Sequence, residues 1–378
     1  MLCLIFFSFF FKPSQSKIQL SGKNMKTTSY KSLFILLFTI LFVSGCQRIS
    51  PVNPPMSATV LETMLPSAVD KIPMEAKVTR IHLSEPLDEP KAELSGLTWA
   101  GDWLILLPQY PDRFENQIYR LNHQIILDAV ADPSMVLAPD PVIFNSDGLE
   151  SKVAGFEGFE AITTNGTDAF LTIETHSAGS KGYLVKGIWE ADYSQLTLDA
   201  TSLTLIPTQM NISNSSYESV LVFGARIFTI YEANGANINA HPRAEMFDQA
   251  LNSASSLSFP NIEYRITDVT QPDENGEFWA INYFYPGDLS KLNPADDVLA
   301  QTYGKGMTHA NSPVVERLVA FQFSEDGIVF ADKAPIQLQL LPDDVARNWE
   351  GLARLDQIGF LLSTDKFPET WLAFVAYP

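Results

Sequence analysis

Residues 160–174 read EAITTNGTDAFLTIE, which is two short apolar runs around the turn Asn165-Gly166-Thr167-Asp168 with a glutamate at each end. Runs rich in β-branched and aromatic residues on either side of an Asn-Gly turn are typical of a β-hairpin. Residues at equal distances from such a turn are cross-strand neighbours. We therefore expect Glu160 and Glu174 to meet at the open end of a hairpin.

The same pattern recurs along the chain, with two polar residues fourteen or fifteen positions apart around a turn. The five pairs are Ser95 with Gln109, Glu160 with Glu174, Glu218 with Glu232, Asp268 with Asn282, and Glu350 with Asp365. Hairpins repeated in this way are typical of β-propellers, whose units stack radially around one axis. The predicted fold is all-β, a single propeller that carries the ten polar residues to one end of its axis as a central funnel.

Five hairpins predict five blades, most of them completed by further strands, such as IQLQLL at 336–341 in the fourth unit. The last unit runs out of chain at Pro378, whereas AKVTRIHLS at 76–84 precedes the first unit without a partner. We expect strand 76–84 to complete the last blade and to remove an exposed sheet edge. Six blades are the alternative if 122–146 or 283–313 contains a degenerate unit.

The N-terminal region has the layout of an exported lipoprotein. A basic stretch after Met25 is followed by the apolar run LFILLFTILFV and by Val43-Ser44-Gly45-Cys46, the order of a signal peptide. Val43 to Cys46 resembles a bacterial lipobox, which implies cleavage before Cys46 and diacylation of its sulfur. The alternative is a transmembrane anchor, but the run has eleven residues and a spanning helix needs about twenty.

These features divide the chain into three parts. Residues 1–45 are read as a signal peptide whose true start is Met25, residues 46–75 as the lipidated cysteine with a proline-rich flexible tether, and residues 76–378 as the propeller. The expected location is the cell envelope, anchored by lipid, and the outer membrane if the cell is Gram-negative. Cys3 and Cys46 are the only cysteines, so disulfides and cysteine metal sites are excluded from the folded part.

The net charge is −19, and it becomes −24 without the first 45 residues, which hold five lysines and no acidic residue. A field of this sign repels nucleic acid and anionic lipid head groups and attracts cations. The charge therefore argues against nucleic-acid binding.

Three strand openings carry a family resemblance: Ser-Gly-Leu at 95–97, Phe-Glu-Ala-Ile at 159–162 and Trp-Glu-Gly-Leu-Ala at 349–353. They resemble two bacterial propeller families, the "esterase-like activity of phytase" domain and the SdiA-regulated propellers. The resemblance implies a propeller with a polar funnel and a calcium ion. Gluconolactonase-like propellers place acidic and asparagine ligands around one axial metal, and the matching positions here are Glu160, Asp268, Asn282 and Glu350. Ser95 stands where the other units begin with an acid, so this ring of ligands is incomplete.

Seven of the ten paired residues are carboxylic acids, and crowding them is unfavourable. Two unit charges about 4 Å apart repel by roughly 4 kcal/mol at an effective dielectric near 20. Protonation, a bound cation or the protein's own Arg and Lys can relieve this repulsion. Oxygen ligands without cysteine favour Ca²⁺ or Mg²⁺ over zinc, and we expect Ca²⁺ because it tolerates irregular oxygen cages best. The structural alternative is that these acids bond backbone N–H groups and hold the blades together.

The function expected from this chemistry is metal-assisted hydrolysis of a small ester, lactone or phosphoester, with Glu160 and Glu350 as catalytic residues. The alternative is a non-catalytic surface lipoprotein that binds a small molecule, a glycan, a peptide or a partner protein through its funnel. The long loop 283–313, which carries His309, is read as a lid. The sequence has no Gly-x-Ser-x-Gly elbow, His-Glu-x-x-His motif or P-loop, which argues against those classes of enzyme.

Overall fold

A computed structural model describes residues 72–90, 92–176 and 181–378. They belong to one compact unit, Pro66–Pro378. The predicted signal peptide, Cys46 and most of the predicted tether lie outside the described residues. Among the residues that are described, no helix is both long enough and apolar enough to cross a membrane.

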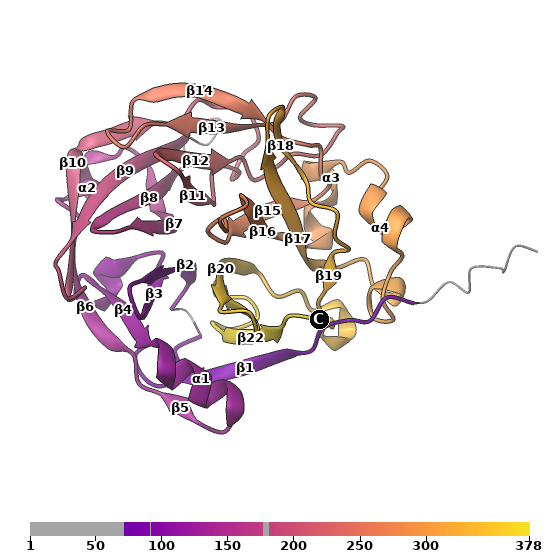
Figure 1. Cartoon of the computed structure of the whole chain (residues 1–378), viewed down its shortest axis with the longest axis horizontal. Coiled ribbons are helices and arrows are strands. Elements are labelled where there is room, and N and C mark those ends of the chain that lie inside the picture. Colours follow the sequence, from indigo (N-terminus) through magenta and orange to yellow (C-terminus); the bar gives the residue numbers. More distant parts are fainter. Residues whose placement is uncertain (1–71, 91, 177–180) are drawn as a thin grey trace, which may run out of the picture. The chain divides into compact units, whose positions relative to one another are not determined.

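The described chain is all-β, as predicted, and its antiparallel units follow one another around a centre in a propeller-like arrangement (Figure 1). The strands of the first two units are β2 (Leu94–Ala100), β3 (Trp103–Pro108), β4 (Gln117–Asn122) and β6 (Asp140–Asn145), then β7 (Phe156–Asn165), β8 (Asp168–Thr175), β9 (Lys181–Trp189) and β10 (Gln195–Leu205). A parallel pairing of β6 with β10 joins these two units into one sheet.

The next two units have the same order of antiparallel strands. They consist of β11 (Val220–Phe223), β12 (Arg226–Ile230), β13 (Arg243–Phe247) and β14 (Ser253–Ser258), then β15 (Arg265–Val269), β16 (Glu277–Phe284), β17 (Val315–Ser324) and β18 (Gly327–Phe330). In the second of them, the predicted fourth strand at 336–341 is confirmed only in part. The tight turn before Gly327 returns the chain at once, so β18 occupies that place, and only β19 (Ile336–Gln337) of the predicted segment pairs, with Arg317 and Leu318 of β17.

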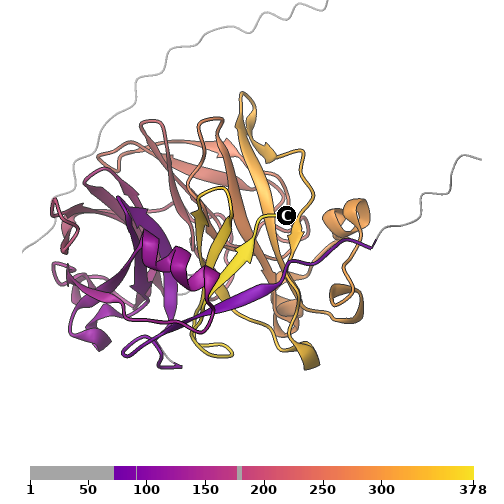
Figure 2. The same cartoon turned by 60° about the horizontal axis from the view of Figure 1, so that its bottom comes forward.

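The last sheet combines the two ends of the described chain. Strands β20 (Trp349–Leu355), β21 (Gly359–Thr364) and β22 (Leu372–Ala376) are followed in the sheet by β1 (Val78–Leu83). The antiparallel register pairs Val78 with Val375 and Ile81 with Leu372. β1 runs beside β22 in both views (Figures 1 and 2), and β5 (Val136–Leu137) pairs with its outer edge.

The two segments in which a sixth unit was the alternative are described in full and contain no additional four-stranded sheet. Residues 122–146 hold α1 (His123–Ala131), β5 and β6. Residues 283–313 hold the short helices η2 (Pro286–Asp288), α3 (Leu289–Leu292), α4 (Val298–Tyr303) and η3 (His309–Asn311). The remaining short helices are η1 (Pro111–Phe114), α2 (Leu149–Lys152) and η4 (Pro342–Asp344).

The core consists of apolar clusters between neighbouring sheets. In β3, Leu104 and Leu106 pack toward the β20–β21 sheet, whereas Ile105 and Leu107 pack toward β7 and β8. Successive side chains of a strand point to opposite faces, so a strand buried on both faces must be apolar throughout. This is why the inner strands read as continuous apolar runs.

Candidate functional site

The first strand of every unit except the third has a β-bulge, close to the polar residue that the sequence pattern selected. Between β7 and β8 the register shifts from Phe159 to Ala161, so that Glu174 faces Gly158 and Glu160 is the extra residue. The equivalent shifts surround Ser95, Asp268 and Glu350. A bulge re-aims the side chain it contains. The expectation that pair members face each other directly is therefore wrong.

The Gly that follows the bulge residue in two units allows the inner strands to approach. A Cβ atom on Gly351 would lie 2.8 Å from Cγ of Leu97 and 3.3 Å from the carbonyl carbon of Gly96. A Cβ atom on Gly96 would instead lie 3.3 Å from Cα of Ala161. The Glu-Gly-Leu motif thus serves packing of β20 on β2, and the Ser-Gly-Leu motif serves packing of β2 on β7.

Three of the ten paired residues are hydrogen-bonded within the framework and do not line the central cavity described below. The Ser95 hydroxyl donates to the Phe159 carbonyl at 2.6 Å. The Asp268 carboxylate accepts from the backbone N–H groups of Val269 and Leu352 at 2.8 and 2.7 Å. The third residue, Asn282, donates through its amide to the Glu263 and Arg265 carbonyls and accepts from Arg317.

Six other members of the pairs converge on a hollow of about 250 Å³, here called the acidic cavity. Its lining consists of Gln109, Tyr110, Glu157, Glu160, Glu174, Asn214, Glu218, Arg265, Asn348, Glu350, Asp365 and Lys366. Six carboxyl groups thus face only two basic side chains. The predicted polar funnel exists for these members of the pairs, and Glu232 lies beside it as a partner of Arg265.

Neutral donors hold three of the carboxyl groups. Gln109 donates to Glu160 at 2.9 Å, Asn348 donates to Glu350, and the Phe367 N–H donates to Asp365 at 2.9 Å. Burial raises the pKa of Glu160 to about 7, although the bond from Gln109 opposes the shift. Burial also raises the pKa of Glu350 well above its ordinary value and raises that of Asp365. At neutral pH, Glu160 is therefore divided between the acid and its anion.

Of the buried carboxyl groups that line the acidic cavity, Glu174 is the one least engaged in hydrogen bonds. Its side chain is 5% exposed, and in the described part of the chain its Oε1 has no hydrogen-bond partner. Burial first, and then the nearby Glu160, Glu218 and Glu232, raise the pKa of Glu174 to about 10. An unpartnered buried carboxylate oxygen is costly unless it carries a proton or meets a ligand.

Arg265 neutralises the opposite side of the cluster. Its guanidinium donates to Glu232 through Nε and to both oxygens of Glu218 at 3.0 and 3.2 Å. Burial would lower the pKa of Arg265, but the two carboxylates raise it, so the group stays charged. The paired pattern in the sequence does not include Arg265. The available signal was a lone arginine at the start of an inner strand, on the cavity side of Asp268.

The four residues that the resemblance implied as calcium ligands do not form one cage. Glu160 and Glu350 line the acidic cavity, but the side chains of Asp268 and Asn282 are bonded elsewhere. Among residues 72–90, 92–176 and 181–378, no three His, Cys, Asp or Glu side chains are arranged to hold a single metal ion.

The two ends of loop 283–313, which was expected to be a lid, lie at different places in the structure. His309 is buried, with Nδ1 2.9 Å from the Glu75 carboxylate and Nε2 3.1 Å from the Glu316 carbonyl, and it does not line the acidic cavity. The beginning of the loop, with Tyr285, Asp288 and Lys291, lines a second hollow of about 440 Å³, here called the vestibule. His309 therefore anchors the loop to the N-terminal segment in this structure.

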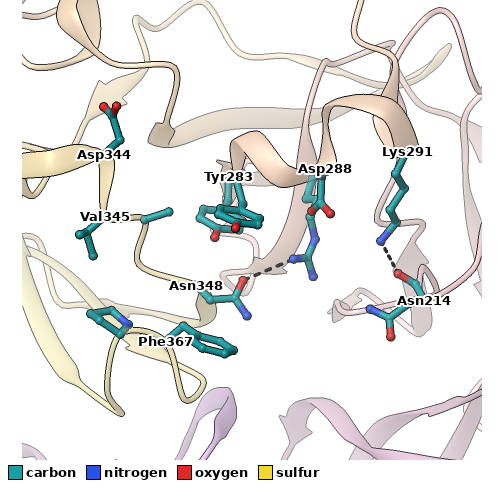
Figure 3. Close-up of a pocket in the computed structure, with 12 residues that line it drawn as sticks. Asn214, Tyr283, Asp288, Lys291, Asp344, Val345, Asn348 and Phe367 are labelled. Atoms are coloured by element: carbon teal, nitrogen blue, oxygen red, sulfur yellow. Dashed lines mark hydrogen bonds between the residues drawn. The ribbon is translucent and has the colours of Figure 1, made fainter.

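The vestibule adjoins the acidic cavity, because Asn214, Arg265 and Asn348 line both. Figure 3 shows Tyr283 and Phe367 on opposite sides of Asn348, which accepts a 3.3 Å hydrogen bond from Arg265. Lys291 donates to the Asn214 carbonyl on the far side of the same hollow. A polar chamber thus opens into one that contains aromatic rings.

Comparisons with known proteins do not assign a family. No family model and no curated protein matches the chain. Solved structures with similar folds include Kuenenia stuttgartiensis hydrazine synthase, with 9% identity over 71% of this chain and 61% of that chain and a TM-score of 0.34. A glucose dehydrogenase has 9% identity over 80% and 99% of the two chains and a TM-score of 0.40. The soluble aldose sugar dehydrogenase of Escherichia coli has 10% identity over 80% and 99% and a TM-score of 0.38.

The chain spans about three fifths of the length of the hydrazine synthase chain. At these TM-scores and identities, the likenesses carry no argument about activity.

Proposed function

We propose that the described strands constitute a five-bladed propeller closed by β1. In support, apolar clusters lie between each successive pair of four-stranded units, including the pair formed by β2–β3 and β20–β21. The pairing of β1 with β22 supplies the fourth strand of the last unit.

A cysteine pair tests the closure. Thr79 and Phe374 are register partners, so Thr79→Cys with Phe374→Cys should cross-link under mild oxidation. The control, Arg80→Cys with Phe374→Cys, is shifted by one residue and should not, because neighbouring side chains leave a strand on opposite faces. Equal cross-linking of both pairs would contradict the closure.

For the function, we propose that the acidic cavity binds a small ligand through a positively charged group. The observation that carries this proposal is the buried Glu174 carboxylate, which lines the cavity with an oxygen that has no partner among the described residues. The excess of carboxyl over basic groups supports a cation over an anion, and Arg265 is already bonded to two carboxylates.

An ammonium group suits this cavity better than the calcium ion expected from the sequence. Calcium takes six to eight oxygen ligands. Here Glu160, Glu350 and Glu218 each accept hydrogen bonds from a different side chain, namely Gln109, Asn348 and Arg265, so their oxygens are already engaged separately. An ammonium group needs only a few acceptors, since it donates three hydrogen bonds.

Isothermal titration with ethylamine and with CaCl₂ at pH 7 tests both cations. We expect ethylamine to bind, and Glu174→Gln to abolish the binding, while the matched change Glu157→Gln at the cavity edge weakens it less. Absence of ethylamine binding at millimolar concentration would overturn the proposal. Calcium binding without ethylamine binding would restore the metal site.

Hydrolysis of a small ester, lactone or phosphoester is the second candidate, and Glu160 favours it. This carboxyl lines the cavity and has a pKa of about 7, which suits a general acid or base at neutral pH. Chromogenic substrates of the three classes test it, with Glu160→Gln and Glu350→Gln as variants. Turnover that survives both substitutions would remove this candidate.

We further propose that the chain is exported and anchored by lipid at Cys46. The support is the order of basic stretch, apolar run and lipobox-like residues before it. Radioactive palmitate should label the protein made in a bacterial host, and Cys46→Ser should lose the label. Labelling that persists in Cys46→Ser would contradict the anchor.

A further inference from the structure

The vestibule has the chemistry of a binding surface for an apolar body. Phe367 and Tyr285 are 58% and 51% exposed, and both line it together with Val345 and Pro368. These side chains come from two different units, Tyr285 from the loop after β16 and Phe367 from the loop after β21. Exposed aromatic residues that gather at a hollow mark a ligand site more often than exposed aromatic residues scattered singly over a surface.

The charges of the vestibule do not favour an anionic ligand. Its two basic groups are Arg265, which is bonded to Glu218 and Glu232, and Lys291, which donates to the Asn214 carbonyl. Asp288 and Asp344 line the same hollow. A negatively charged ligand would therefore have to compete with contacts that already exist.

The two hollows together have the size of a small-molecule site. Their volumes of about 440 and 250 Å³ lie within the range of roughly 300–1,000 Å³ that is usual for such sites when they are taken as one space. The shared residues Asn214, Arg265 and Asn348 mark the passage between them.

We propose that the ligand is a small amine with a flat apolar body, which rests on the proposed binding of a cation in the acidic cavity. Its ammonium group donates to Glu174, whose pKa a cation at this place lowers again so that the proton is released on binding, and to the neighbouring carboxylates. Its body lies in the vestibule against the rings of Tyr285 and Phe367. Aromatic faces attract both apolar surface and the positive end of such a molecule.

Calorimetric titration of the purified full-length protein in detergent tests this ligand class at pH 7. The probes are ethylamine, 2-phenylethylamine and 2-phenylethanol, which separate the charge from the ring. We expect 2-phenylethylamine to bind at least about tenfold more tightly than ethylamine, because the ring buries apolar surface against aromatic side chains. 2-Phenylethanol should bind at least about tenfold more weakly than 2-phenylethylamine, because it lacks the charge that the carboxylates recognise.

Variants separate this inference from the function on which it rests. Phe367→Ala should reduce the affinity for 2-phenylethylamine about tenfold and leave ethylamine unchanged, since one stacked ring is worth about that factor. Ile358→Ala, an exposed apolar side chain at the turn between β20 and β21, is the control and should change neither.

The outcomes differ clearly. Equal affinities for ethylamine and 2-phenylethylamine would overturn the inference about the vestibule and leave the cation site standing. If neither amine bound, the proposed function would fail and the inference with it. Equal binding of 2-phenylethanol and 2-phenylethylamine would overturn the role of the ammonium group.

Discussion

The hairpins of the second and third units carry the same sequence pattern, two glutamates fourteen residues apart, but their glutamates have different surroundings. Glu218 and Glu232 share the guanidinium of Arg265. Glu160 is held by the neutral Gln109. In the described part of the chain, Glu174 and Glu232 each have a buried oxygen without a hydrogen-bond partner, but Glu232 also has an ion pair with Arg265. The difference comes from a residue outside both hairpins, since Arg265 belongs to the fourth unit. A carboxyl pattern therefore specifies where acids gather, while the neighbouring unit decides which of them is neutralised.

Of the changes that test this difference between the two hairpins, removal of Arg265 should have the largest effect on the free energy of unfolding. Arg265→Met leaves Glu218 and Glu232 buried without a counter-charge, which should lower the free energy of unfolding by about 3–5 kcal/mol. Urea unfolding at pH 7 measures the loss. Arg113→Met removes a half-exposed partner of Glu93 and should cost less than about 1 kcal/mol.

A combined variant makes this prediction sharper. Glu218→Gln and Glu232→Gln added to Arg265→Met should recover part of the lost stability, because the two unpaired charges are then gone. A loss for Arg265→Met no larger than that of Arg113→Met would show that the third-unit pair does not depend on the arginine.

The sequence was sufficient for the all-β class and for the convergence of Gln109, Glu160, Glu174, Glu218, Glu350 and Asp365. Turn spacing and apolar alternation are local signals, and both survive in the structure. The bulges at Ser95, Asp268 and Glu350 were not predictable from symmetric spacing, because an extra residue leaves the hairpin pattern almost unchanged. Three members of the pairs do not line the acidic cavity, because their side chains form hydrogen bonds with backbone groups. These are Ser95, Asp268 and Asn282. These hydrogen-bond partners are determined by how neighbouring units pack, and a local sequence pattern carries no information about that packing.

Glu174→Gln should have the next largest effect, with the opposite sign. Burial raises the pKa of Glu174 from 4.5 to about 10, so the folded state keeps a proton that the unfolded state loses. The stability due to this proton is complete below the ordinary pKa and declines as the pH rises toward the folded value. At pH 7, which is about 2.5 units above the ordinary pKa, Glu174→Gln should therefore be more stable than the parent by about 3 kcal/mol, since each unit corresponds to about 1.4 kcal/mol.

Urea unfolding at pH 7 and at pH 4.5 checks the sign, because the gain should vanish at the lower pH. Glu232→Gln is the matched change in the other hairpin, and it should destabilise the protein because Arg265 loses a partner. Loss of stability in Glu174→Gln at pH 7 would contradict the assignment of Glu174 as the unneutralised member.

A smaller effect is expected for Glu160, whose pKa burial raises from 4.5 to about 7 while Gln109 donates to it. The stability due to its proton is complete below the ordinary pKa and is lost as the pH rises through about 7. Glu160→Gln should reduce the fall in unfolding free energy between pH 5.5 and 7.5 by about 2 kcal/mol. Unfolding at these two pH values measures it, and an unchanged fall would place the titrating group elsewhere in the cluster.

The smallest effect should come from Lys366, the other basic residue of the acidic cavity. Its ammonium group lies 3.4 Å from Glu93 and its side chain is 41% exposed, so water and salt screen its charge. Lys366→Met should change the free energy of unfolding by about 0.5 kcal/mol or less, and raising NaCl from 0.05 to 0.5 M should remove the difference. If Lys366→Met cost as much as Arg265→Met, the peripheral lysine would be neutralising the cluster. The contrast between the two hairpins would then arise from the rim of the cavity and not from the fourth unit.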